Sequence, residues 1–300
     1  MKYLELYNFP TIELLYKAFK LKKSKNIDLC SIINAKSGLC KENCIFCAQS
    51  IYHNTQINIY PLLSKEKILE VAKNLDGKVN RFSIVVSGKE VNGDEFSKII
   101  EIIELLKEET NLKICCSLGL LDKDKLKELK KLNVRIHNNL ETNRDYFKNI
   151  CTTHTYEDKL RTILLAKKMG LEVCSGGIIG LGESREDRIK LALELKKLKV
   201  DSIPINILIP IKGTKAYELY KRGIIQPLSI DEILKTIAIF KIINKDSEIR
   251  LAGGRNYLKD FQSLSLLALD GLMVGNYLTT KGRNLKNDLE MINNFKKIIE

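Results

Sequence analysis

The sequence predicts an α/β protein: a closed (β/α)8 barrel of the TIM type with an N-terminal helical extension. Two observations favour this fold. Strand-like and helix-like segments alternate along the chain, with eight strands and a helix after each, and 300 residues is an ordinary length for one such barrel. Because no tract rich in Pro, Gly or Ser divides the chain, residues 1–300 are expected to form a single domain.

The predicted strands are short apolar runs rich in β-branched residues. They span residues 30–35, 81–88, 112–119, 134–141, 171–180, 201–210, 249–254 and 271–275. The predicted helices repeat apolar residues every three or four positions, and several open on an Asp or Ser that can cap them. They span residues 64–76, 94–109, 122–132, 155–169, 184–198, 230–245, 257–269 and 287–300, and one more precedes the first strand. Long loops over residues 36–63 and 211–229 follow the first and sixth strands, at the end of the barrel where such proteins place their active sites.

The composition indicates a protein of the reducing cytoplasm. The chain has no run of 18 apolar residues and no signal-peptide pattern, so neither a membrane span nor export is expected. Eight cysteines in such a chain are expected to be free thiols. The net charge of +13 arises mostly from lysines on helix faces, which favours a solvated surface over nucleic-acid binding. A basic surface also suits a small acidic protein partner.

Three cysteines within eight residues carry the clearest chemical signal. Cys40, Cys44 and Cys47 form the pattern C-x3-C-x2-C, with Phe46 before the last cysteine. Each residue spans at most about 3.5 Å, so the three sulfurs can converge on one small centre. Three thiolates on a cubane of four irons leave one iron without a protein ligand, as an open position marks a catalytic metal. Two simpler interpretations stay open: a structural zinc ion with His53 as its fourth ligand, and a disulfide.

A second group of functional side chains is expected inside the barrel, because residues two apart in a strand face the same side. The inward-facing set is predicted to be Cys30, Cys115, Ser117, His137, Asn139, Glu141, Cys174, Pro204, Asn206, Leu208 and Arg250. A buried arginine requires a partner or a ligand, so a polar, thiol-lined lumen indicates a function. Cys116 and Cys151 are expected to pack as small apolar residues.

The fifth strand ends in the glycine-rich segment CSGGIIGLGES over residues 174–184. Glycines let a ligand approach the backbone closely. Near the cysteine loop, this segment is expected to cradle a nucleoside.

With these features in view, the chain resembles the radical S-adenosylmethionine (SAM) enzymes and, among them, the biotin synthase family. The motifs that carry the resemblance extend across nearly the whole chain. They are NAKSGLCKENCIFCAQS (34–50), HNNLET (137–142), NICTTHTYEDKL (149–160), EVCSGGIIGLGE (172–183), PINILIPIKGT (204–214), IRLAGGR (249–255) and LTTKGR (278–283).

The resemblance implies a [4Fe–4S] cluster on Cys40, Cys44 and Cys47, with SAM bound to the open iron. Cleavage of SAM would give a 5′-deoxyadenosyl radical that removes a hydrogen atom from dethiobiotin. Sulfur from a second iron–sulfur cluster in the barrel would then bond to that carbon, and a second round would close the ring of biotin. A reduced flavodoxin or ferredoxin as electron donor, and a homodimer, are implied in the same way.

The resemblance also implies roles for single residues. Asn139 and Asn206 would bind the ureido ring of dethiobiotin, since amides both donate and accept hydrogen bonds. Glu141 would bind the ribose of SAM, and Lys159 stands where the family often has an arginine near the methionine carboxylate. The residues facing the adenosine would be Gly176, Gly177, Ile178 and Gly180, and those near the carboxylate of the substrate would be Thr279 and Thr280.

One departure from the family pattern affects the second cluster. The familiar [2Fe–2S] site uses three cysteines and an arginine, of which Cys115, Cys174 and Arg250 are present, but Ser83 stands at the remaining cysteine position. A hydroxyl is a poor ligand for iron beside a thiolate. Cys30, on the neighbouring first strand, is expected to compensate, in a cluster of two irons or a larger variant of four irons with an extra sulfide. The alternative is that Cys30 only packs.

Two other functions compete with this interpretation. Another radical SAM barrel, such as a hydrogenase-cluster maturase, would share the cysteine loop but not HNNLET, IRLAGGR and LTTKGR together. From a different class, a metal-stabilised nucleic-acid-binding protein would hold a redox-inert metal and bind nucleic acid in a salt-dependent way.

Overall fold

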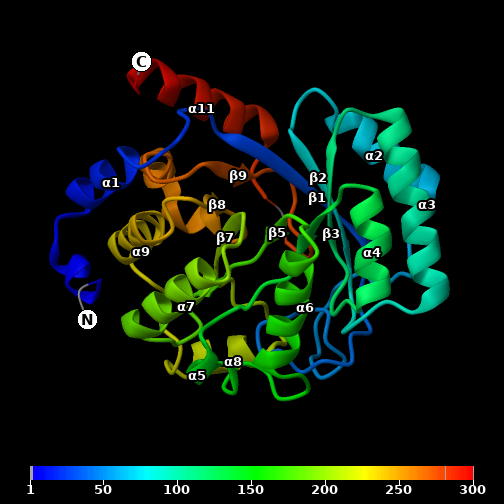
Figure 1. The fold of residues 1–300 in the computed structure, drawn as a ribbon. Helices are drawn as coiled ribbons and strands as arrows, with labels where there is room; N and C mark the ends of the chain where they lie inside the picture. Colours follow the sequence, from blue (N-terminus) through cyan, green and yellow to red (C-terminus); the bar gives the residue numbers. More distant parts are fainter. Residues whose placement is uncertain (1–2, 281, 300) are drawn as a thin grey trace.

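The core of the protein is one sheet of parallel strands that closes on itself (Figure 1). The computed structural model describes residues 3–280 and 282–299. The strands are β1 (Asp28–Lys36), β2 (Arg81–Val86), β3 (Lys113–Ser117), β4 (Arg135–His137), β5 (Val173–Cys174), β6 (Gly177–Ile179), β7 (Ser202–Ile207), β8 (Glu248–Leu251) and β9 (Gly271–Met273). Their order in the sheet is β5-β4-β3-β2-β1-β9-β8-β7-β6, and β5 also pairs with β7.

The predicted fifth strand is divided between β5 and β6, and this division allows the barrel to close. Cys174 of β5 pairs with His137 of β4 on one side and with Ser202 of β7 on the other. The short strands β5 and β6 therefore share one strand position in the barrel. The resulting eight strand positions follow one another around the barrel in chain order, which confirms the predicted fold. Gly176 lies at the break because a Cβ there would stand 2.0 Å from the carbonyl oxygen of Pro204.

Helices cover the outside of the barrel (Figure 1). The α-helices are α1 (Thr11–Phe19), α2 (Lys65–Leu75), α3 (Gly93–Glu109), α4 (Lys123–Lys131), α5 (Arg144–Phe147), α6 (Tyr156–Lys168), α7 (Arg185–Lys197), α8 (Lys215–Lys221), α9 (Ile230–Ile243), α10 (Gln262–Ser265) and α11 (Leu285–Ile299). Two 3₁₀ segments are η1 (Leu4–Asn8) and η2 (Arg255–Phe261). No helix in the described part of the chain is both long and apolar enough to cross a bilayer.

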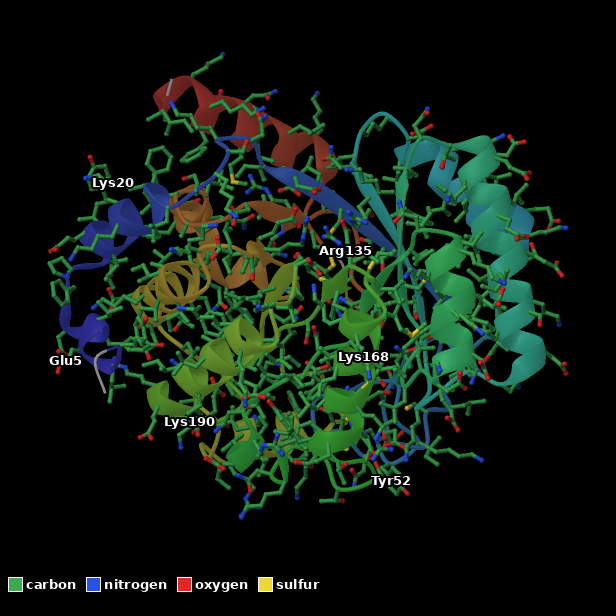
Figure 2. The ribbon with its side chains drawn as sticks, in the orientation of Figure 1. Glu5, Lys20, Tyr52, Arg135, Lys168 and Lys190 are labelled. Carbon is green, nitrogen blue, oxygen red and sulfur yellow. The ribbon has the colours of Figure 1, made fainter. Side chains whose placement is uncertain are left out.

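Polar residues set the starts of these helices. The side chains of Ser64, Asn92 and Asp122 accept a backbone N–H three residues on, and Thr155 and Ser184 form full capping boxes. The N-terminal extension, η1 and α1, packs on α9, where Tyr7 and Thr236 share a hydrogen bond of 3.0 Å. Lysines such as those labelled in Figure 2 lie exposed on the outer helices, whereas Arg135 is buried inside the barrel.

Three predicted elements differ from the structure. The loop over residues 211–229 contains α8, and the fourth strand is regular only from Arg135 to His137, because Glu141 has a left-handed φ of 69°. The predicted helix 257–269 is instead η2 followed by α10, with a break at Lys259, where φ is 48°. The single-domain organisation of residues 1–300 stays a prediction.

A fully buried ion pair joins the end of the barrel to the last helix. Arg255 in η2 and Asp288 in α11 are both 0% exposed, and one of their hydrogen bonds is 2.9 Å long. Gln262 of α10 also accepts a hydrogen bond from the Arg255 guanidinium. The charges of the two residues are thus satisfied only by each other and by a few neighbours.

We expect Asp288→Ala to lower the free energy of unfolding by about 3–5 kcal/mol, because it leaves the buried Arg255 charge without its partner. The control is Glu13→Ala, which breaks the half-exposed Lys17–Glu13 pair and should cost less than about 1 kcal/mol. Urea unfolding of both variants measures the difference. Equal losses for the two variants would contradict the importance of the buried pair.

Candidate functional site

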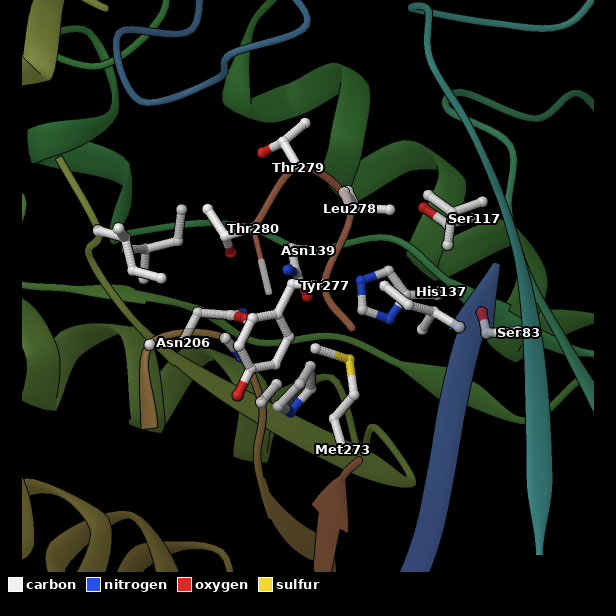
Figure 3. Close-up of a pocket in the computed structure, with 18 of the residues that line it drawn as sticks. Ser83, Ser117, His137, Asn139, Asn206, Met273, Tyr277, Leu278, Thr279 and Thr280 are labelled. Carbon is white, nitrogen blue, oxygen red and sulfur yellow. The ribbon is translucent and has the colours of Figure 1, made fainter. Parts of the chain in front are cut away.

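The barrel encloses a cavity of about 320 Å³ that opens at the carboxyl ends of the strands (Figure 3). Every residue of the predicted inward-facing set lines it: Cys30, Cys115, Ser117, His137, Asn139, Glu141, Cys174, Pro204, Asn206, Leu208 and Arg250. Cys116 instead lies in the apolar core between sheet and helices, as the alternation of strand side chains requires. The volume is typical of a site for a small organic ligand.

Three thiols meet in the deep part of this cavity. Cys30, Cys115 and Cys174 come from β1, β3 and β5. The pKa of Cys115 is raised to about 12, mainly by burial and also by Cys174, while Arg81 and Arg135 oppose the shift. Burial likewise raises the pKa values of Cys30 and Cys174. Three sulfurs in one cavity, with cationic neighbours, form a donor set that suits soft metal centres.

Three arginines form the floor beneath the thiols, and only Arg250 was expected from the sequence. Arg81 and Arg135 also line the cavity and are at most 7% exposed. They were predictable in principle, because each lies two residues before an inward-facing residue of its own strand, Ser83 and His137. The Nε of Arg81 is buried and has no hydrogen-bond partner among the described residues.

Carboxylates at the bottom of the barrel neutralise this floor. Glu172 lies 2.8 Å from Arg135 and 3.4 Å from Arg81, and Glu248 lies 3.0 Å from Arg135. Arg250 pairs with Asp28 and donates to its backbone carbonyl at 3.0 Å. Burial alone would raise the pKa of Glu248, but Arg135 and Arg250 outweigh burial, so this carboxyl ionises more readily than usual.

Ser83 pairs with Cys115 of β3 on one side and with Ile32 of β1 on the other. Its side chain lines the cavity (Figure 3), and its hydroxyl lies near enough to the Cys115 thiol to lower the pKa of that thiol slightly. Cys30 stands two residues before Ile32 on the adjacent strand. Cys30 and Ser83 therefore line the same cavity from neighbouring strands.

The two cavity asparagines are held by the backbone. Asn139 accepts a hydrogen bond from the N–H of Gly176 at 3.0 Å, and Asn206 accepts one from Gly253 at 2.9 Å. Each amide nitrogen makes one longer contact, to Glu141 at 3.4 Å and to the carbonyl of Gly177 at 3.3 Å. Because an amide nitrogen carries two protons, each side chain keeps an N–H for a ligand in the cavity.

The upper part of the cavity holds a histidine and an acid. Burial lowers the pKa of His137 to about 4, although Glu141 opposes the shift, so the imidazole is neutral at pH 7. Burial raises the pKa of Glu141, while Lys159 and His137 lower it. Thr279 and Thr280 close the mouth from the segment after β9 (Figure 3).

The predicted cluster cysteines lie beside this mouth, in a second cavity of about 210 Å³. Cys40, Cys44 and Cys47 line it together with Glu141 and Lys159. The two cavities share Phe46, Cys47, Gln49, Val85, Ser117, Glu141 and Leu278 in their linings. A centre held by the three cysteines would therefore adjoin the barrel cavity.

Backbone contacts fix the shape of the cysteine loop. The N–H of Cys40 donates to Gln49 at 3.0 Å, and the N–H of Cys47 donates to Cys44 at 3.0 Å. The ring of His53, the candidate fourth zinc ligand, contacts the backbone carbonyl of Cys47 at 2.8 Å. All eight cysteines are free in the structure. Three thiols around a cavity, with one side open to a cationic lysine, fit a [4Fe–4S] cluster with an open iron.

Cys151 lies in the buried apolar core, as expected, and also has polar neighbours. It is buried, but its Sγ lies 3.2 Å from Nδ1 of His154 and 3.4 Å from Oδ1 of Asn43. The sequence offered a signal that was not used, because Cys151 and His154 lie in the motif NICTTHTYEDKL that also contains Lys159. Cys151 is therefore more than a packing residue.

The glycine segment is explained partly by packing. A Cβ at Gly177 would stand 2.4 Å from the carbonyl oxygen of Glu141, so this glycine, like Gly176, lets two strand ends approach. Ile178 of β6 lines the main cavity, whereas Gly180 lines a separate small pocket near Tyr220.

Comparison with known proteins gives two family matches. Residues 36–195 match the radical SAM superfamily, and residues 204–296 match the biotin and thiamin synthesis associated domain.

Among curated proteins, a biotin synthase from Methanocaldococcus jannaschii is 59% identical, with 96% of this chain and 91% of that protein covered. A biotin synthase from Methanococcus aeolicus is 61% identical over 96% of this chain and 90% of its own length. A biotin synthase from Thermotoga petrophila is 47% identical, with 100% of this chain and 99% of that protein covered.

Solved structures share the fold at low sequence identity. Methylornithine synthase superposes with a TM-score of 0.82 at 18% identity, covering 97% of this chain and 90% of its own. The FeFe-hydrogenase maturase from Carboxydothermus hydrogenoformans superposes with a TM-score of 0.78 at 18% identity, covering 97% and 73%. These structural similarities confirm the barrel fold. The family is instead shown by the curated proteins of high sequence identity. By its identity to those relatives over nearly its full length, the chain belongs to the biotin synthase family of the radical SAM superfamily.

Proposed function

We propose that this protein converts dethiobiotin to biotin by inserting a sulfur atom between two unactivated carbons. The observation that carries the proposal is the thiol-lined cavity of about 320 Å³ that adjoins the C-x3-C-x2-C loop, in a chain 59% identical to a biotin synthase. The cavity is large enough for a small bicyclic product. It is lined by the side-chain amides of Asn139 and Asn206 and by the thiols of Cys30, Cys115 and Cys174.

Two cofactor sites follow from the donor sets. Cys40, Cys44 and Cys47 would hold a [4Fe–4S] cluster, and Glu141, Lys159 and Ile178 would contact SAM bound next to it. When bound, the cluster and SAM supply a radical that removes hydrogen atoms from the substrate, and a second cluster supplies the sulfur. Gly176 and Gly177 let the strand ends beside the site approach each other, and we propose that the segment from Gly176 to Gly180 faces the adenosine.

The protein's own residues position the substrate. The free N–H groups of Asn139 and Asn206 are proposed to donate to the ureido carbonyl, because the carbonyl groups of both side chains already accept backbone N–H groups. Thr279 and Thr280 at the mouth are proposed to bind the substrate carboxylate. Walls formed by Phe46 and Leu278 exclude water, which protects a reactive intermediate from side reactions.

The second cluster is proposed to use Cys30, Cys115 and Cys174, with Arg250 beside them. The unpartnered Nε of Arg81 and the cationic floor supply donors and positive charge for thiolates and sulfide. A ligand set with Cys30 in place of a thiol at position 83 differs from the familiar two-iron site. It is compatible with two irons or with four irons and an extra sulfide.

A reduced flavodoxin or ferredoxin is the proposed electron donor. The net charge of +13 favours association with such a small acidic protein. A homodimer is a further proposal that rests on family membership.

The activity is tested by anaerobic turnover of the reconstituted protein with SAM, dithionite and dethiobiotin. We expect biotin by mass spectrometry and 5′-deoxyadenosine formation that depends on dethiobiotin. Formation of 5′-deoxyadenosine that is indifferent to dethiobiotin, with no biotin, would favour another radical SAM reaction.

Cys30→Ala is expected to remove the second cluster and leave about four irons per chain, the content of one cubane. The double variant Cys30→Ala/Ser83→Cys should regain the excess iron, because position 83 faces the same cavity from the adjacent strand. Iron and sulfide analysis with Mössbauer spectra on anaerobic protein measures both effects. Cys116→Ala is the control, since that thiol lies in the apolar core.

A full second cluster in Cys30→Ala would show that Cys30 only packs. No excess iron in the wild type would mean that the barrel holds no second cluster.

Asn206→Asp is expected to weaken dethiobiotin binding by about 5- to 150-fold, the effect of about 1–3 kcal/mol for an unsatisfied buried polar group. The aspartate keeps the acceptor for the Gly253 N–H but loses the donor for the ureido carbonyl. Asn138→Asp is the control, because Asn138 donates to the carbonyl of Gly119 outside the cavity. Equilibrium binding of dethiobiotin and of SAM is measured, and an unchanged dethiobiotin affinity would remove Asn206 from the substrate site.

A further inference from the structure

A compact set of metal-binding side chains joins Cys44 of the cysteine loop to Cys151 and His154, which have no role in the proposed reaction. Within the described part of the chain, Cys44, Cys151 and His154 form the one group of three or more such residues whose donor atoms all lie within 4.8 Å of one another. Cys151 and His154 are buried, and Cys44 is half-buried. Glu42, also buried, contacts Nδ1 of His154 with its carboxylate.

We propose that these residues form a mononuclear site for a thiophilic divalent cation such as Zn²⁺, filled in protein that lacks the iron–sulfur cluster. Cys44, Cys151 and His154 are the ligands, and Glu42 contacts the imidazole of His154 and holds it in place. Two thiolates and an imidazole are ligands that Zn²⁺ accepts, with water at the fourth position of the tetrahedron.

The distances suit one ion better than a cluster. With Zn–S near 2.3 Å and Zn–N near 2.0–2.1 Å, tetrahedral ligands stand roughly 3.6–3.8 Å apart. The observed separation between Sγ of Cys151 and Nδ1 of His154 is 3.2 Å, and no pair in the group exceeds 4.8 Å. Thiolates on different irons of a cubane stand further apart than ligands of one ion. The motif cysteines Cys40, Cys44 and Cys47 do not form such a tight group.

The two segments that carry the ligands are clamped together on both sides of the site. The N–H of Ile45 donates to Ile150 at 2.9 Å, and the N–H of Thr152 donates to Oδ1 of Asn43 at 2.9 Å. The N–H of Asn43 in turn donates to Oγ1 of Thr153 at 3.0 Å. These bonds hold the loop of Cys44 against the loop of Cys151 before any ion binds, which lowers the cost of assembling the ligands.

The carboxylate is oriented as well. Thr153 donates from its hydroxyl to Oε2 of Glu42 at 2.8 Å, the oxygen that contacts His154. Partners of this kind orient metal ligands and tune their basicity.

Cys44 belongs to both this site and the predicted cubane, so the ion and the cluster exclude each other. Zinc bound here would occupy one of the three thiols that the cluster needs. Zn²⁺ would therefore compete with assembly of the iron–sulfur cluster on the cysteine loop. This competition would not require SAM, dethiobiotin or the second cluster.

The test uses the full-length chain, reduced, anaerobic and free of iron, titrated with Zn²⁺ against a chromogenic chelator. We expect one tightly bound Zn²⁺ in the wild type and at least about 100-fold weaker binding in Cys151→Ala, because even an outer-shell partner is worth about 10- to 100-fold. Cys116→Ala, which also loses one buried thiol, and Cys40→Ala should bind as the wild type does. His154→Gln provides a second ligand variant, and far-ultraviolet circular dichroism shows that each variant is folded.

Co²⁺ in place of Zn²⁺ gives an independent readout, since its thiolate charge-transfer absorption should weaken in Cys151→Ala. One equivalent of Zn²⁺ should slow cluster reconstitution in the wild type and not in Cys151→Ala. Wild-type affinity in both Cys151→Ala and His154→Gln would overturn the proposal, as would the absence of Zn²⁺ binding in the wild type. Loss of binding in Cys40→Ala would place the ion on the three motif cysteines instead and also overturn it.

Discussion

The barrel is organised around three guanidinium groups buried at its floor. A buried cation is tolerated only when opposite charges and hydrogen bonds surround it, and Arg81, Arg135 and Arg250 obtain these from carboxylates at the lower ends of the strands. Most barrels of this architecture fill the interior with branched apolar side chains in layers. Here the lowest layer is ionic, so the layers above it can be polar and can leave a cavity.

This floor also determines what the thiols above it can become. Burial alone keeps Cys30, Cys115 and Cys174 protonated, whereas the arginines favour their thiolate forms. A metal centre takes the place of the protons, since its ligands must be deprotonated. Because β1 and β2 are hydrogen-bonded neighbours, the inward-facing side chains at positions 30 and 83 line the same cavity. This arrangement supports the proposal that Cys30 replaces a thiol at position 83.

The sequence predicted the barrel, the inward-facing thiols and the cysteine loop because all three follow from local rules. A period of two assigns Cys115 to the lumen and Cys116 to the outer core without any knowledge of the tertiary structure. The same rule would have found Arg81 and Arg135. The environment of Cys151 could not be found this way, because it depends on two loops that are more than 100 residues apart in sequence and are joined through Asn43. The break in the predicted helix lies at Lys259, whose positive φ of 48° no local sequence pattern indicates.

The side chains of Asn139 and Asn206 both stabilise the closed barrel and line its cavity. The fifth strand breaks at Gly176, and the N–H released by the break is accepted by Asn139, a residue of the cavity wall. Asn206 in the same way accepts the N–H of Gly253, past the end of β8. An unpaired backbone N–H in a buried position is costly, so these asparagines stabilise the fold whether or not a ligand is present. Their carbonyl groups are thereby fixed, and only their amide protons face the cavity. A ligand with a hydrogen-bond acceptor between the two amides suits this arrangement, and the urea carbonyl that we propose to bind there is such an acceptor.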